Sequence, residues 1–272
     1  MKKIITLISL SFLFPACDNL DDMPPQANEK EAIQNPIVKH VLGENDYINY
    51  DSYVNIVSNV TLTPYEPYIN DGSLHFEGWF PAKEKVGGVL INNRILLNRN
   101  NDYYKTYSYE QTDEMVSDKN ELFGKTINIK TVDTSESSVY YNLNLNSTVL
   151  TRINKLEVFG LKDINKLYSN TDLLIKWDVT TETDENILLY LYDTKEVGAG
   201  NQPKQLVKKI KYKEGEIKIS SSELNNLFLE DSDLVFTMVK AKQVSNFVSP
   251  SNKIFAVQSL EFLNYAGIKF KK

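Results

Sequence analysis

The feature that most constrains the fold is an alternation of apolar and polar residues that recurs along much of the chain. It is clearest where Val139, Tyr141, Leu143 and Leu145 alternate with Tyr140, Asn142, Asn144 and Asn146. A period of two residues is that of a β-strand with one buried face, whereas an amphipathic helix repeats about every 3.6 residues. Helical periodicity is scarce past residue 40, so the sequence predicts an all-β protein.

Turn residues separate these strands at the spacing of β-sandwiches. Asn92-Asn93 lies between two apolar runs, and asparagine tolerates the positive φ angles of a two-residue type I′ turn, so this pair predicts a hairpin. Strand-like segments continue to a last one over 260–270. We predict two β-sandwich domains, over 41–150 and 151–272.

The second half has one strand with a clear apolar face and one that is apolar on both faces. Leu173, Ile175, Trp177 and Val179 alternate with other residues, so Trp177 is expected to be buried. The strand over 187–192 is apolar on both sides and is expected near the centre of a sheet. In strand count and in its single early tryptophan, this half resembles the immunoglobulin-like and fibronectin type III sandwiches. The resemblance is architectural and implies no particular function.

The first 16 residues have the pattern of an export signal. Lys2 and Lys3 precede the apolar segment 4–14, which is shorter than the roughly 20 residues that a membrane-spanning helix needs. Ala16 and Cys17 follow, and Cys17 is the only cysteine. This arrangement resembles the lipobox of bacterial lipoproteins, although Phe14 and Pro15 depart from its usual residues. The resemblance implies removal of residues 1–16 and a membrane anchor through lipid on Cys17.

Residues 17–40 are predicted to form an acidic, flexible tether, because this segment has almost no apolar pattern. Asp18, Asp21 and Asp22 follow the cysteine. Such acidity resembles the surface-export signal of Bacteroidota-type lipoproteins. Asp18 alone also resembles the signal that retains lipoproteins of other diderm bacteria in the inner membrane. Because the acidity extends beyond one position, we expect the outer membrane or the cell surface.

Composition removes several classes of function. The chain has 36 acidic and 30 basic residues, and this net negative charge disfavours nucleic acid as a partner. One cysteine and two histidines leave few ligands for metal or thiol chemistry, so no cofactor is expected. Carboxylate clusters such as Glu230, Asp231 and Asp233 are candidates for calcium binding or acid–base chemistry, but such clusters are usually solvated turns.

The candidate ligand-binding residues are aromatic: Trp79, Tyr103, Tyr104, Tyr107 and Tyr109. They flank the asparagine-rich segment 98–102, whose polar groups could orient a ligand while the rings supply contact area. Aromatic residues are also common in strands for packing alone. We expect a non-catalytic binding module for a glycan or an envelope protein. The alternative is an envelope hydrolase with a carboxylate-based site.

The lipid anchor gives the first testable prediction. Mass spectrometry of the membrane fraction should detect an acylated N-terminal peptide that begins at Cys17. Cys17→Ser should release the chain from membranes, because the anchor rests on that thiol. An intact Met1 terminus, or unchanged membrane association of the Cys17→Ser variant, would contradict the prediction.

Overall fold

The computed structural model describes the following residues: 36–64, 71–80, 86–100, 103–110, 125–133, 139–146, 156–179, 184–195, 204–248 and 253–272. Within them the chain is mostly β, as the alternation predicts, with one sheet of 13 strands and one of three. The predicted signal segment and Cys17 lie outside the described residues.

The main path of the large sheet runs, in spatial order, through β13 (Gln205–Lys211), β12 (Asn186–Asp193), β15 (Asp233–Val248), β16 (Lys253–Lys271), β1 (Ser52–Leu62), β2 (Asp71–Trp79), β5 (Tyr103–Glu110), β4 (Arg94–Asn100), β3 (Val86–Ile91), β6 (Thr126–Asp133) and β7 (Val139–Asn146). Off this path, β10 (Lys166–Tyr168) pairs with β16 and with β9 (Leu161–Lys162). The small sheet has the order β14 (Glu216–Ile219), β11 (Leu173–Trp177) and β8 (Leu156–Phe159). The described helices are α1 (Pro36–Leu42), the 3-10 helix η3 (Tyr212–Glu214) and α4 (Ser221–Leu227).

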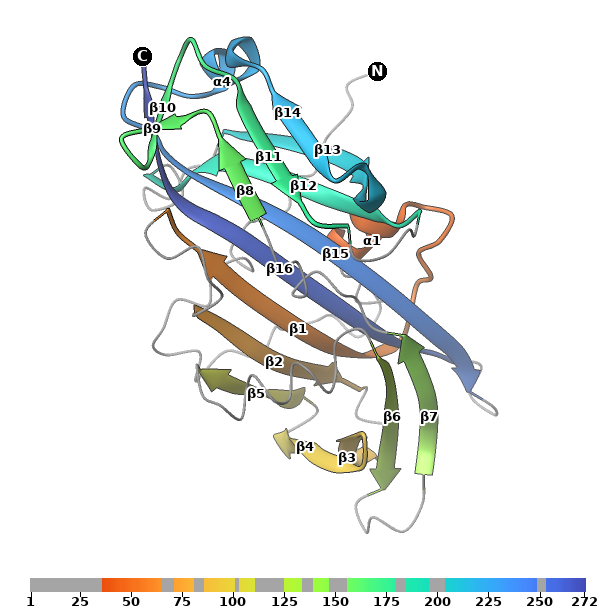
Figure 1. Cartoon of the computed structure of the whole chain (residues 1–272). Helices are drawn as coiled ribbons and strands as arrows, with labels where there is room; N and C mark the ends of the chain where they lie inside the picture. Colours follow the sequence, from red (N-terminus) through yellow and green to blue (C-terminus); the bar gives the residue numbers. More distant parts are fainter. Residues whose placement is uncertain are drawn as a thin grey trace.

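Two long antiparallel strands, β15 and β16, cross the whole molecule diagonally (Figure 1). The first strand, β1, pairs in parallel with β16 along its full length, from Ser52 opposite Phe255 to Leu62 opposite Tyr265. Strands from the two halves of the sequence therefore share one hydrogen-bonded sheet. The expected boundary near residue 150 lies outside the described residues, and two separate sandwiches are not clearly distinguished.

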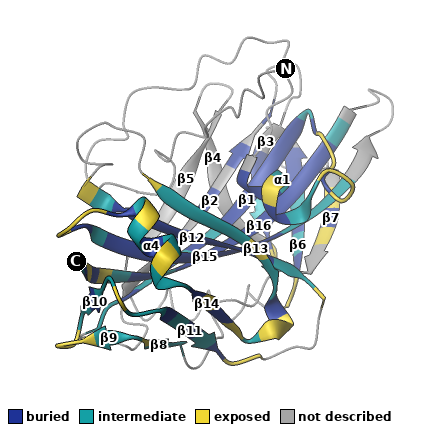
Figure 2. Cartoon of the chain, turned by 90° about the horizontal axis from the view of Figure 1, so that it is seen from above, coloured by how far each residue is buried: buried dark blue, intermediate teal, exposed yellow. Residues whose placement is uncertain are grey.

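The described residues form three apolar clusters, and each draws on both halves of the sequence. The first lies between the small sheet and one end of the large sheet, and it includes Val60 of β1 beside Trp177 and Phe236. The second fills the other end, where the sheet curls, and joins Ile56 to Phe255. The third lies on the opposite face of the large sheet. Buried residues line the long strands throughout (Figure 2).

Residues 36–40, which the sequence assigns to the tether, are part of helix α1. Ile37, Val38 and Val41 are buried in the third cluster, against strands β12 and β15. These three residues recur at helical spacing, which is why they form one apolar face. The folded part of the chain thus begins no later than Pro36.

Several local predictions are confirmed. Asn92 and Asn93 have φ angles of 50° and 66° and connect β3 to β4, as a type I′ turn requires. Trp177 is buried, and its indole N–H donates to the carbonyl oxygen of Tyr212 at 2.8 Å. Val179 differs from the prediction because β11 ends at Trp177, and its side chain is 39% exposed.

Helix α4 begins with a complete capping box. Ser220 accepts a hydrogen bond from the backbone N–H of Glu223, and the Glu223 carboxylate accepts one from the backbone N–H of Ser220. Ser220 and Glu223 are three residues apart, which is the spacing of this motif. Lys208 of β13 lies 2.7 Å from Glu223. This ion pair ties α4 to the edge strand of the large sheet.

The burial of Trp177 predicts a large loss of stability on truncation. Trp177→Ala should lower the free energy of unfolding by about 3–5 kcal/mol, because it leaves a cavity and removes the indole hydrogen bond to Tyr212. Val179→Ala, in the same segment but beyond the strand, should change it by less than about 1 kcal/mol. Urea unfolding followed by circular dichroism measures both. Equal effects of the two substitutions would show that Trp177 is not part of the core.

The capping box predicts a pH-dependent contribution to stability. The hydrogen bond from Lys208, followed by those from Ser220, lowers the pKa of Glu223 to about 2 from its usual 4.5. Because the folded pKa lies below the unfolded one, this stabilisation is present above about pH 4.5 and is lost as the pH falls toward 2. Glu223→Gln should unfold more easily than the parent at pH 7, and the difference should shrink over that range. A difference that is constant from pH 7 to pH 2 would contradict this assignment.

Candidate functional site

A cluster of amide side chains lies on the sheet at the β6–β7 end. We call it the asparagine face and define it by Asn92, Asn93, Asn128, Lys130, Asn142 and Asn144. Asn92, Asn93, Asn142 and Asn144 are exposed, and Asn128 and Lys130 are partly exposed. Exposed residues of β7, the last strand of the sheet, are visible in Figure 2.

The strand alternation places these side chains on one face. Ile127, Ile129 and Leu143 are buried in the second cluster, so the residues between them point away from the core. In the β6–β7 pairing, Asn128 is opposite Asn144 and Lys130 is opposite Asn142. The β3–β4 turn lies beside β6, because Ile91 pairs with Ile129. Three segments that are distant in sequence thus form one polar surface.

Hydrogen bonds fix the orientation of the amides. The Asn128 Nδ2 group donates to Oδ1 of Asn142 at 2.7 Å and to Oδ1 of Asn144 at 2.9 Å. Oδ1 of Asn92 accepts from the backbone N–H of Asn128 at 2.9 Å, and Oδ1 of Asn93 accepts from Lys130 Nζ at 3.1 Å. Four amide oxygens are therefore engaged within the cluster. Among the described residues, the Nδ2 groups of those four asparagines have no hydrogen-bond acceptor.

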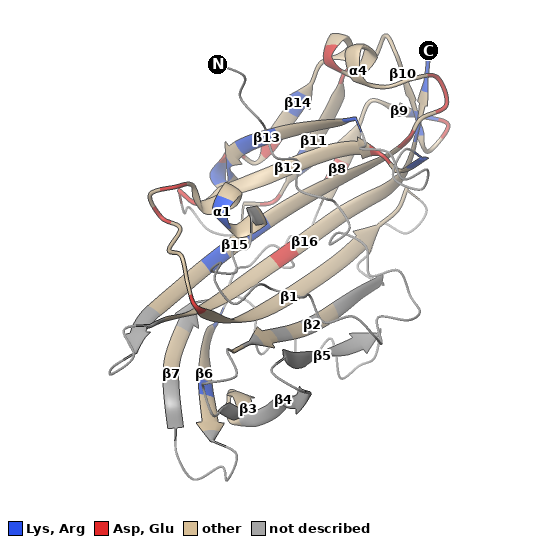
Figure 3. Cartoon of the chain, turned by 180° about the vertical axis from the view of Figure 1, so that it is seen from behind, with Lys and Arg blue, Asp and Glu red and all other residues tan. Residues whose placement is uncertain are grey.

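The charge around this face is opposite to that of the whole chain. Strands β3, β4, β6 and β7 contain Arg94, Arg99 and Lys130 but only one acidic residue, Asp133, at the end of β6. Figure 3 shows the basic position on β6. Of these basic residues, Lys130 has a described side chain, and it lies within the asparagine face.

The predicted aromatic residues lie on two neighbouring strands, β2 and β5. In their antiparallel pairing, Trp79 is opposite Tyr103, Gly78 is opposite Tyr104 and Phe76 is opposite Tyr107, while Tyr109 is opposite Leu74. The fold therefore brings Trp79 and the four tyrosines to adjacent backbone positions. Their side chains lie outside the described part of the structure, so their role as a binding surface stays a prediction.

The acidic cluster near the start of β15 is neutralised by lysines. Asp231 pairs with Lys271, and Asp233 pairs with Lys269 and, at 3.6 Å, with Lys195. The hydrogen bond from Lys271 lowers the pKa of the Asp231 carboxyl. These contacts make the cluster a surface ion-pair network. Within the described residues, no three histidine, cysteine or acidic side chains lie together as a metal site would need.

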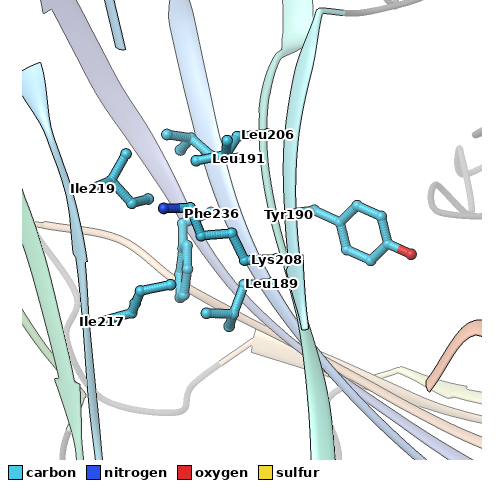
Figure 4. Close-up of a pocket in the computed structure, with 8 residues that line it drawn as sticks. All are labelled: Leu189, Tyr190, Leu191, Leu206, Lys208, Ile217, Ile219 and Phe236. Atoms are coloured by element: carbon cyan, nitrogen blue, oxygen red, sulfur yellow. The ribbon is translucent and has the colours of Figure 1, made fainter. Parts of the chain in front are cut away.

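An apolar pocket too small to hold a water molecule lies between β12, β13 and β14 (Figure 4). Leu189, Leu191, Leu206, Ile217, Ile219 and Phe236 line it, together with Lys208 and Tyr190. The Tyr190 ring points away from the other side chains, and Lys208 pairs with Glu223. The lining thus offers no converging set of catalytic groups. No helix in the described part of the chain is both long enough and apolar enough to cross a membrane.

Sequence reasoning found part of the asparagine face without recognising it as a site. The alternation identifies Asn142 and Asn144 as the polar side of a strand, and the turn rule identifies Asn92 and Asn93. Only the register joins them to Asn128 and Lys130. A repeat of asparagine at alternate positions, where charged residues are the usual solvent-facing choice, is the signal that could have drawn attention to it.

No protein-family model matches the chain, and no curated protein sequence matches it either. Among solved structures, the chain has weak similarity to the fibronectin(III)-like modules of Clostridium thermocellum CbhA, with 10% sequence identity. The match covers 80% of this chain and 94% of that one, with a TM-score of 0.20. A similarity at this level carries no argument about activity or ligand.

Proposed function

We propose that this chain is a lipid-anchored, non-catalytic glycan-binding protein of the cell envelope and that the asparagine face is its binding surface. The observation that carries the proposal is the set of exposed amides held in place by their own hydrogen bonds. Sugars present many hydroxyl groups, and fixed amide groups can bind these without the entropy cost of ordering on contact.

The position of the face also supports this function. It lies on a rigid sheet, with Ile127, Ile129 and Leu143 of the same strands packed in the core behind it. A site on strands holds its polar groups more precisely than a site on loops. β7 is the last strand on the described path of the sheet, and its Asn142 and Asn144 are exposed, so a ligand can reach their amides.

The remaining sequence-based expectations belong to the same proposal. Acylation of Cys17 would hold the protein at the outer membrane or cell surface, and the residues before Pro36 would act as the tether. The cluster between the small sheet and the large sheet would form the core of an immunoglobulin- or fibronectin-like sandwich, and the second cluster that of the other sandwich. The aromatic residues on β2 and β5 would add a second contact area, and β4 and β3 lie between β5 and β6 in the sheet.

A glycan array probed with the purified full chain in detergent tests this function. The double variant Asn142→Ala/Asn144→Ala should lose glycan retention, because it removes two exposed amides and their neighbours' hydrogen bonds. Its stability should change little, since both side chains are exposed. Asn170→Ala, an exposed residue next to β10, is the matched control and should bind like the parent.

Two outcomes would contradict the proposal. One is that the parent protein binds no glycan on an array that includes neutral and acidic polysaccharides. The other is that the double variant binds as well as the parent. If Tyr104→Ala/Tyr107→Ala abolished binding while Asn142→Ala/Asn144→Ala did not, the predicted aromatic residues would be the site instead.

A further inference from the structure

We infer that the asparagine face binds an acidic glycan, one that carries carboxylate or sulfate groups along an extended chain. The inference rests on the proposed function and names the chemical class of its ligand. It follows from the direction of the hydrogen bonds within the cluster, and from the spacing and charge of the groups that the cluster leaves free.

The first step is the polarity of the exposed groups. An asparagine amide carries one acceptor oxygen and a donor NH2 group. Here the oxygens of Asn92, Asn93, Asn142 and Asn144 are engaged within the cluster by the donors of Asn128 and Lys130. Those four side chains therefore offer their NH2 groups to a ligand. A surface of donors selects a ligand rich in acceptors.

The second step is charge. An ionised carboxylate or sulfate is an acceptor without donor hydrogens, and hydrogen bonds to a charged group are about twice as strong as neutral ones. Lys130 lies within the cluster, 3.1 Å from Oδ1 of Asn93. Arg94 immediately follows the turn in the sequence, and the one acidic residue in strands β3, β4, β6 and β7 is Asp133, at the end of β6. The local charge therefore favours an anionic group over a neutral hydroxyl.

The third step is spacing. Asn142 and Asn144 are two residues apart on one strand, with Cα atoms about 7 Å apart, and their Oδ1 atoms converge on the Nδ2 group of Asn128. The turn residues Asn92 and Asn93 extend the donors across the neighbouring strand. An extended polymer with repeated acidic groups satisfies several donors at once, whereas a free anion satisfies one or two.

A pair of polymers that differ only in charge tests the inference. Polygalacturonate and its fully methyl-esterified form share a backbone, so a difference in binding reports the carboxylates. We expect the full chain in detergent, at physiological ionic strength, to bind polygalacturonate at least about tenfold more tightly than the ester, which corresponds to one charge-assisted hydrogen bond or more. Binding is measured by biolayer interferometry.

Variants that keep the shape of the side chains test whether binding depends on the NH2 donors or only on surface contact. Asn142→Asp/Asn144→Asp keeps an oxygen for Asn128 and replaces the outward NH2 groups with anionic oxygens. It should weaken polygalacturonate binding by at least about tenfold and leave any binding of neutral glycans within a few-fold. The matched control Asn170→Asp introduces the same kind of charge next to β10, away from the face, and should have little effect. Circular dichroism confirms that each variant is folded.

The outcomes distinguish this inference from the proposed function. Equal or tighter binding of the ester, or tight binding of neutral glycans by both the parent and the Asp variant, would overturn the acidic ligand and leave a glycan-binding face. Binding of no glycan at all would overturn both. Competition by inorganic sulfate at the same molar concentration of charge as polygalacturonate would show that a free anion suffices and would overturn the polymeric ligand.

Discussion

The parallel pairing of β1 with β16 is the contact on which the rest of the structure depends. The two strands are about 200 residues apart in a chain of 272, so their pairing closes a very long loop. On one side of this pair, β15, β12 and β13 continue the sheet, and on the other side β2 begins the path that ends at β7. Without the pairing, the strands that carry the asparagine face would have no link through the sheet to the C-terminal half. Such non-local pairing is characteristic of slow-folding β proteins.

The first and second apolar clusters lie on the same side of the long strands β15 and β16. A row of buried polar residues separates the two clusters where they meet. Lys240, Glu261 and Ser58 are opposite one another on β15, β16 and β1, between the apolar row of Met238, Leu263 and Val60 and the row of Val244, Val257 and Val54. Lys240 is 1% exposed; its Nζ lies 2.5 Å from Glu185 and 4.5 Å from the centre of the Tyr212 ring. A buried charge is tolerated only when it is paired in this way, and removing one partner is costly. The polar row therefore fixes the register of the three strands, because a slip would bring these groups against apolar neighbours.

The sequence was informative wherever a rule is local. The Asn92-Asn93 turn and the strand through Leu143 depend on a few neighbouring residues, and the structure has both. The sequence predicted a tether to residue 40, because three apolar residues in a short segment give little periodic signal, yet Ile37, Val38 and Val41 pack as a helix. The pairing of β1 with β16 has no local signature at all. For the same reason, every residue of the asparagine face stands in the sequence, but no local pattern predicts that these residues lie side by side.

The orientation of the amides matters more to recognition than the net charge does. The chain carries a charge of −6, and on that basis alone an acidic ligand would be repelled. At physiological ionic strength, however, exposed charges more than about 8 Å apart are largely screened, whereas contacts at hydrogen-bond distance are not. The groups nearest the ligand are four NH2 groups and one lysine. They therefore determine that the site favours a ligand of negative charge. The distant acidic residues act on the approach of the ligand, where repulsion slows association and salt relieves it. Added salt should thus speed association of an acidic polymer while weakening its final contacts, and the two effects are separable as the association and dissociation rates.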